Sequence, residues 1–212
     1  MKATWTLSAL ASVTTMIALP AHAEYFGLAS GRTADLGRLP DVSVEAGVMI
    51  GDIYDFDYQQ IGARINYRID PLLMVYGDFG LTDIEDADGN TFGVGAFYVM
   101  EGIFEGSDFA LKGSYHRGSV DEDGFETDLD AITVEGLFSG REPFGANDNL
   151  RWYANVGIHR LSSDSEGGSD DSETEFGFGG GVVVPTAQGE FYVGLDLIDE
   201  MTFGGGFRYF LQ

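Results

Sequence analysis

The chain has 212 residues, a formal net charge of −24 and no cysteine. The charge argues against a nucleic-acid partner, because an acidic surface repels phosphate. Without cysteine, a disulfide scaffold, a thiolate metal site and a cysteine nucleophile are excluded. The 31 glycines, 16 phenylalanines and 10 tyrosines against five prolines are typical of many short strands, and no window carries a sustained helical period.

The first 23 residues predict a secretory signal peptide. Lys2 is a short positive region, residues 7–19 form an almost uncharged apolar stretch, and residues 21–23, Ala-His-Ala, match a cleavage site. The stretch is short for a membrane-spanning helix, the alternative being a retained anchor. We therefore expect Sec export to the bacterial outer membrane and a mature chain beginning at Glu24. Residues 24–40 are expected to form a periplasmic segment or an extra strand, and 41–212 the main domain.

Ten segments of about ten residues carry a period of two, and at ~3.3 Å per residue each can cross the apolar band of an outer membrane. They are residues 42–51, 58–69, 72–82, 91–102, 107–118, 127–139, 149–161, 174–184, 189–198 and 201–211. The pattern predicts an all-β fold, a closed antiparallel transmembrane β-barrel of about ten strands, with eight to twelve possible.

One face of these segments is apolar and the other carries charges among small polar residues. In a membrane barrel the apolar face contacts lipid and the polar face lines the lumen. A secreted soluble barrel of lipocalin type is the alternative, with the faces reversed, although a soluble exterior normally has more lysine than the single Lys112 of the mature chain. The predicted lumen charges are Glu45, Arg64, Arg68, Asp78, Lys112, Glu135, Arg151, Glu175, Asp196 and Arg208, and Glu190 lies on the same face.

The excess negative charge falls between the segments, in 83–90, 119–126 and 162–173, which we expect to be long acidic loops outside the cell. A solvated surface is one interpretation; divalent cations bridging to lipopolysaccharide is the other. Asp121, Asp123 and Asp130 fall at positions 3, 5 and 12 of a calcium-type loop that starts at Ser119. The alternative interpretation is an ordinary hairpin turn, in which the same residue types are common.

The last segment, TFGGGFRYFLQ, resembles the closing strand of outer-membrane barrels, with Gly204, Phe207, Tyr209 and Leu211 at the spacing of their insertion signal. Together with TEFGFGGGVVVP and GEFYVGLDLI upstream, it resembles the small outer-membrane β-barrel family that includes the OmpA transmembrane domain and the opacity proteins. The resemblance implies recognition by the barrel insertion machinery. It supports the fold more than any activity.

The function predicted from these features is non-enzymatic. His116 and His159 are the two histidines of the mature chain, and neither stands in a motif of the outer-membrane proteases or deacylases. No cofactor is expected, apart from surface-bound divalent cations, and the expected partners are membrane lipid and lipopolysaccharide. If the lumen charges pair, the barrel is a closed platform for acidic loops; if water separates them, it is a narrow channel for ions or small solutes. Neither interpretation identifies a protein partner.

Overall fold

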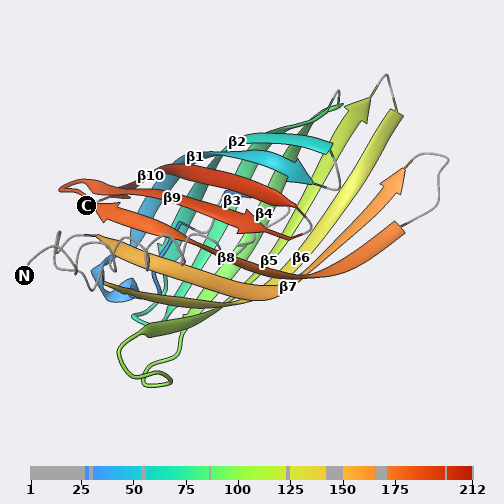
Figure 1. The fold of residues 1–212 in the computed structure, drawn as a ribbon. Helices are drawn as coiled ribbons and strands as arrows, with labels where there is room; N and C mark the ends of the chain where they lie inside the picture. The colour runs from blue at the N-terminus through green and yellow to red at the C-terminus, as the bar shows by residue number, and fades with distance from the viewer. Residues whose placement is uncertain are drawn as a thin grey trace, which may run out of the picture.

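The structure is a computed structural model that describes residues 27–28, 31–53, 56–85, 87–122, 125–141, 150–165, 171–198 and 200–211. Within these residues, ten strands form one closed antiparallel barrel (Figure 1). Each strand pairs with the next along the chain, and β1 pairs with β10 to close the ring. The expected fold class is confirmed, with ten strands. The strands are β1 (Val42–Ile53), β2 (Phe56–Arg68), β3 (Leu73–Ile84), β4 (Ala87–Val99), β5 (Asp108–Glu122), β6 (Phe125–Arg141), β7 (Arg151–Ser165), β8 (Asp171–Pro185), β9 (Gly189–Leu197) and β10 (Met201–Leu211).

Among the described residues, a short 3-10 helix, η1 (Leu36–Arg38), precedes the strands. In the part of the chain that the structure describes, no helix is long and apolar enough to cross a membrane.

The two faces of the wall have the expected polarity. Outward side chains in the middle of the strands are apolar and exposed, for example Val134 at 58% and Phe176 at 61%. Inward charged side chains are buried, for example Arg64 and Arg208. An apolar exterior around a polar interior is the arrangement of a transmembrane barrel. The soluble lipocalin-type alternative is therefore wrong, because it requires the opposite orientation.

The two mouths differ in their connections. We call the mouth where β1 begins and β10 ends the proximal mouth, and the opposite one the distal mouth. At the distal mouth β3 continues to Ile84 and β4 begins at Ala87, while β5 continues to Glu122 and β6 begins at Phe125. Most described residues of the long acidic loops expected at 83–90 and 119–126 are thus in strands, because the hydrogen-bonded ladder continues beyond the predicted ends, to Ile84 opposite Ala87 and to Glu122 opposite Phe125. A longer connection, residues 100–107, lies at the proximal mouth.

The polarity of the wall leads to a stability prediction. Replacing Val134, which points outward midway along β6, by arginine places a charge in the centre of the lipid band and should destabilise the barrel by about 2–4 kcal/mol. Gln59→Arg, at an exposed position near the distal end of β2, is the matched control and should cost about 0–1 kcal/mol. Urea unfolding in lipid vesicles, followed by the mobility of unboiled protein on a detergent gel, measures both. Equal costs at the two positions would contradict the lipid-facing assignment.

Candidate functional site

A row of alternating charges crosses five neighbouring strands inside the lumen. Opposite partners in the strand register run from Glu190 to Arg208, then to Glu45, Arg64 and Asp78. These five residues, which we call the charge row, are all buried. Side chains opposite one another on antiparallel strands lie close enough to interact. Strand pairing alone therefore brings each carboxylate beside a guanidinium.

One end of the charge row is a chain of three side chains. Arg64 donates to Asp78 Oδ2 from Nε at 3.0 Å and from Nη2 at 2.6 Å. The other oxygen of Asp78 lies 3.0 Å from Nε2 of His116 on β5. Between these two residues stands Gly93 of β4, where a Cβ atom would lie 2.0 Å from the His116 ring. A glycine is therefore required for Asp78 to reach His116 across an intervening strand.

The centre of the charge row is Glu45, whose Oε1 accepts three hydrogen bonds. Arg208 Nε and Asn66 Nδ2 each donate at 2.7 Å. The third donor, at 2.5 Å, is Nη2 of Arg32. Arg208 also pairs with Glu190 through Nη1. Arg32 does not belong to the wall, because it precedes β1 in the chain.

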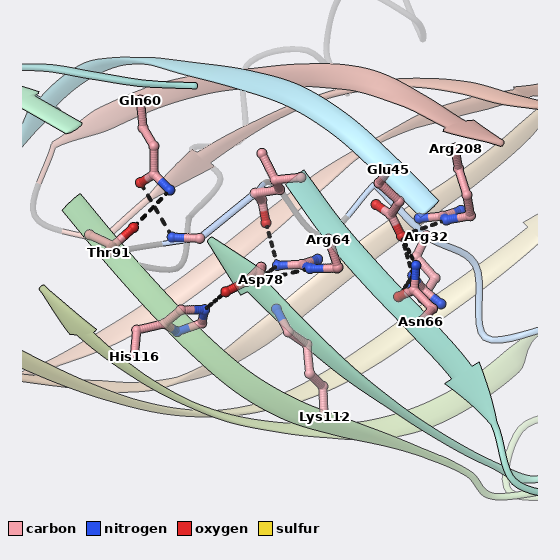
Figure 2. A network of polar contacts seen from close by, with 12 residues as sticks. Arg32, Glu45, Gln60, Arg64, Asn66, Asp78, Thr91, Lys112, His116 and Arg208 are labelled. Atoms are coloured by element: carbon pink, nitrogen blue, oxygen red, sulfur yellow. Dashed lines mark hydrogen bonds and ion pairs between the residues drawn. The ribbon is translucent and has the colours of Figure 1, made fainter. Parts of the chain in front are cut away.

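Arg32 belongs to a segment that lies inside the barrel. Residues 27–28 and 31–41, here called the lumen segment, run into the interior from the proximal mouth, and Leu28, Arg32, Ala34 and Leu36 are almost completely buried. Figure 2 shows Arg32 next to Glu45, Asn66 and Arg208, with Arg64, Asp78 and His116 alongside. The structure thus differs from the expected periplasmic segment or extra strand at 24–40. Residues 24–26 and 29–30 lie outside the described residues.

Side chains of the wall hydrogen-bond the backbone of the lumen segment. Arg64 Nη2 donates to the Leu28 carbonyl at 3.0 Å, and Arg208 Nη2 donates to the Gly31 carbonyl at 3.0 Å. Nearer the proximal mouth, the Ala34 N–H donates to Ser139 Oγ at 2.8 Å. Buried backbone groups must be paired. The two arginines of the charge row therefore donate hydrogen bonds both to carboxylates of the wall and to carbonyls of the lumen segment.

Close packing also fits the segment to the wall. Gly31 has φ +48°, a left-handed conformation that favours glycine, and a Cβ there would lie 2.2 Å from the Tyr192 ring. Cβ atoms at Gly47 and Gly62 would lie 3.3 and 3.2 Å from Leu28 Cδ2. Glycines in the wall therefore leave space for the side chains of the lumen segment.

The charge row is balanced only when Arg32 is included. The wall contributes three carboxylates, of Glu190, Glu45 and Asp78, and two guanidiniums, of Arg208 and Arg64. Arg32 supplies a third guanidinium. An uncompensated charge inside a protein costs several kcal/mol, and breaking one buried pair typically costs about 3–5 kcal/mol. The lumen segment is therefore part of the electrostatic structure of the barrel.

A second polar cluster lies on β5, β6 and β7. Lys112 Nζ contacts Glu135 Oε2 at 2.8 Å, and Asn155 Nδ2 donates to Glu135 Oε1 at 2.8 Å. His159 lies 3.7 Å from the same Oε1 and contacts Thr133 Oγ1 through Nδ1 at 3.1 Å. All five side chains are buried. The two clusters place polar groups on facing parts of the lumen wall.

The structure brings most of the predicted lumen charges together, but not all of them. Arg68 and Arg151 lie at the proximal mouth, where they pair with Asp41 at 2.7 Å and Asp35 at 3.6 Å. Glu175 is partly exposed near the distal end of β8, and Asp196 is buried on β9 away from the charge row.

The other predicted site residues lie on the wall. Tyr209 and Leu211 of the expected insertion signal point outward on β10, while Gly204 faces the lumen; Phe207 contacts Phe191 with ring centroids 4.6 Å apart. Their role in insertion remains a prediction. Asp121 stands opposite Glu126, and Asp130 stands opposite Arg117. Because Arg117 and Asp121 are four residues apart on β5, Asp121 and Asp130 are about 13 Å apart along the wall and do not surround one ion. Asp123 lies outside the described residues.

Sequence reasoning missed Arg32, although a signal for it exists. The strand pattern assigns charges to the lumen from the strands alone, and Arg32 lies before the first strand. The lumen-facing charges that the pattern finds include one more carboxylate than cations, with Glu190 counted. This excess of one carboxylate is a signal for an additional lumen cation, but it does not identify Arg32, which stands in a segment with few other charges.

The fold and its interior define a transmembrane β-barrel whose lumen is occupied by its own N-terminal segment. The expected resemblance to small outer-membrane barrels is confirmed at the level of the fold by the closed antiparallel architecture and the apolar exterior.

No protein-family model matches the chain, and no curated protein matches it. Among solved structures, it is similar to a loop L8 deletion mutant of OmpT, an outer membrane protein of Vibrio cholerae, at 19% identity and TM-score 0.41, covering 93% of this chain and 72% of that one. It is similar to the KdgM porin at 12% identity and TM-score 0.41, covering 80% and 99%, and to LpxR from Salmonella typhimurium at 10% and 0.43, covering 80% and 100%. At such identities the likeness says nothing of activity.

The contact between Asp78 and His116 can be tested through Gly93. Gly93→Ala places a methyl group against the His116 ring and 2.6 Å from Asp78 Oδ1, and should destabilise the barrel by about 1–3 kcal/mol. Gly113→Ala is the matched control, because the nearest atom to a Cβ there is 3.9 Å away, and it should be neutral or slightly stabilising. Urea unfolding of both variants measures the difference. Equal stabilities of the two variants would contradict the close approach of His116 and Asp78 to Gly93.

Proposed function

We propose that the chain is a non-enzymatic barrel of the bacterial outer membrane, a closed platform that carries an acidic surface outside the cell. The observation that supports this best is the charge row completed by Arg32, which fills the lumen with paired, buried groups. A barrel of this size is only slightly wider than the eight-stranded barrels that side chains fill. The lumen segment adds buried residues such as Leu28 and Arg32 to this interior.

The interior offers little to a substrate. His116 and His159 are buried, and each faces a carboxylate inside the closed lumen. A general base must reach the proton that it abstracts. Their burial therefore supports the non-enzymatic interpretation, in which the histidines are members of the polar packing of the lumen.

The distal mouth is the acidic surface of this proposal. Exposed carboxylates lie at the ends of its hairpins, and several stand opposite one another in the strand register, as Asp52 and Asp57 do, and Asp83 and Asp88. Such like charges repel one another and attract cations. We propose divalent cations and lipopolysaccharide phosphates as the partners of this surface, with the barrel insertion machinery as the partner during biogenesis.

A narrow channel is the second candidate. In the described residues the lumen segment is not part of the strand ladder, and inside the barrel its backbone is held by side chains such as Arg64, Arg208 and Ser139. One backbone hydrogen bond, from the Arg68 N–H to the Asp41 carbonyl, holds its proximal end. A segment held in this way can leave without opening the ladder of the wall. The channel would then carry ions past the exposed carboxylates of the charge row.

Planar-bilayer recording separates the two candidates. The refolded chain, with insertion verified by its heat-modifiable mobility on a gel, should give no conductance steps, because paired charges and the lumen segment obstruct the lumen. Stable steps with cation preference in the unmodified chain would contradict the closed platform and favour the channel.

A further inference from the structure

The surroundings of the Arg32 guanidinium are those of a binding pocket. Nη2 contacts Glu45 Oε1 at 2.5 Å and Asn66 Oδ1 at 2.6 Å, while Nη1 contacts Met74 Sδ at 2.8 Å. The guanidinium carbon lies 4.8 Å from the centroid of the Phe97 ring. A carboxylate, an amide oxygen and an aromatic face together suit a planar, weakly hydrated cation better than a compact ammonium.

Arg32 uses this pocket incompletely. A guanidinium and a carboxylate bind most strongly through two parallel hydrogen bonds, but Arg32 reaches Glu45 through one nitrogen and one oxygen. Within the described residues, Nε of Arg32 and Oε2 of Glu45 are buried and form no hydrogen bond. The backbone tether of Arg32 thus leaves one donor and one acceptor of the pair unused.

The pocket belongs to the wall, and its occupant does not. Glu45, Asn66, Met74 and Phe97 come from β1, β2, β3 and β4, which are joined by continuous ladders. The ring of strands closes through β1 and β10 without any residue of the lumen segment. The four wall groups can therefore keep their places when Arg32 is absent.

We propose that the lumen contains a binding site for a monosubstituted guanidinium compound, formed by Glu45, Asn66, Met74 and Phe97 and occupied by Arg32 of the same chain. The lumen segment is then a tethered ligand, and a free guanidinium takes the same place in a chain that lacks the Arg32 side chain. The proposal rests on the proposed function only through the position of Arg32 inside the lumen, and its test does not depend on conductance.

The test is chemical rescue of Arg32→Ala. Truncation leaves Glu45 with one cation fewer in the lumen, so the variant should unfold at lower urea than the unmodified chain. Millimolar N-methylguanidinium should restore stability in a saturable way: at ten times its dissociation constant, a ligand that binds only the folded state raises the folding equilibrium constant about elevenfold. Methylammonium at the same concentration should give no saturable gain. Arg38→Ala, which removes a half-exposed arginine paired with Asp35, is the matched control and should not respond to either compound.

Arg32→Lys tests the same site without an added ligand. Lysine keeps the charge but loses the fork and the planar stacking, so this variant should be less stable than the unmodified chain and should not respond to N-methylguanidinium. The proposal is overturned if Arg32→Lys is as stable as the unmodified chain, if methylammonium rescues Arg32→Ala equally well, or if no added compound rescues it. Conductance of the unmodified chain would refute the closed platform while leaving each of these results interpretable.

Discussion

The structure depends on the burial of the Glu45 carboxylate in the centre of the lumen. A buried carboxylate requires paired cations and hydrogen-bond donors, and strand register supplies Arg208 on one side and Arg64 on the other. Since these arginines are shared with Glu190 and Asp78, the row still has one negative charge too many. Arg32 removes this excess, and in doing so it fixes the path of the lumen segment through the barrel.

Small residues in the wall make that path possible. Glycines face the lumen where large side chains cross it: Gly93 stands under the contact between Asp78 and His116, and Gly47 and Gly206 lie against the Tyr192 hydroxyl. Of the three glycines near the end of the chain, Gly206 thus has a local explanation, because it leaves space for the Tyr192 side chain. Apolar outward residues on the same strands contact lipid. The alternation along one strand therefore matches both the lipid outside the barrel and the polar lumen inside it.

The fold was largely predictable because its signal is local. A period of two along β1 or β10 places Val44 and Tyr209 on one face and Glu45 and Arg208 on the other, whatever the neighbouring strand does. The pairs of the charge row depend on register, which the sequence of a single strand does not determine. The lumen segment was not predictable in the same way, because Arg32 reaches Glu45 through a non-local contact and has no strand period. The distal loops expected at 83–90 and 119–126 were too long, because acidic residues such as Asp83 and Asp88 stay in the ladder.

The position of the lumen segment inside the membrane-embedded barrel is the central claim, and cross-linking measures it most directly. The chain has no cysteine, so the double variant Ala34→Cys with Ser139→Cys carries a unique pair at the place where the Ala34 N–H meets Ser139 Oγ at 2.8 Å. A short thiol-specific cross-linker should join the two positions in lipid vesicles and change the mobility of the boiled protein on a gel. Ala34→Cys with Phe138→Cys, whose side chain points outward on the same strand, should not react in this way. Absence of the first cross-link, or equal yields from both pairs, would contradict a lumen closed by its own N-terminal segment.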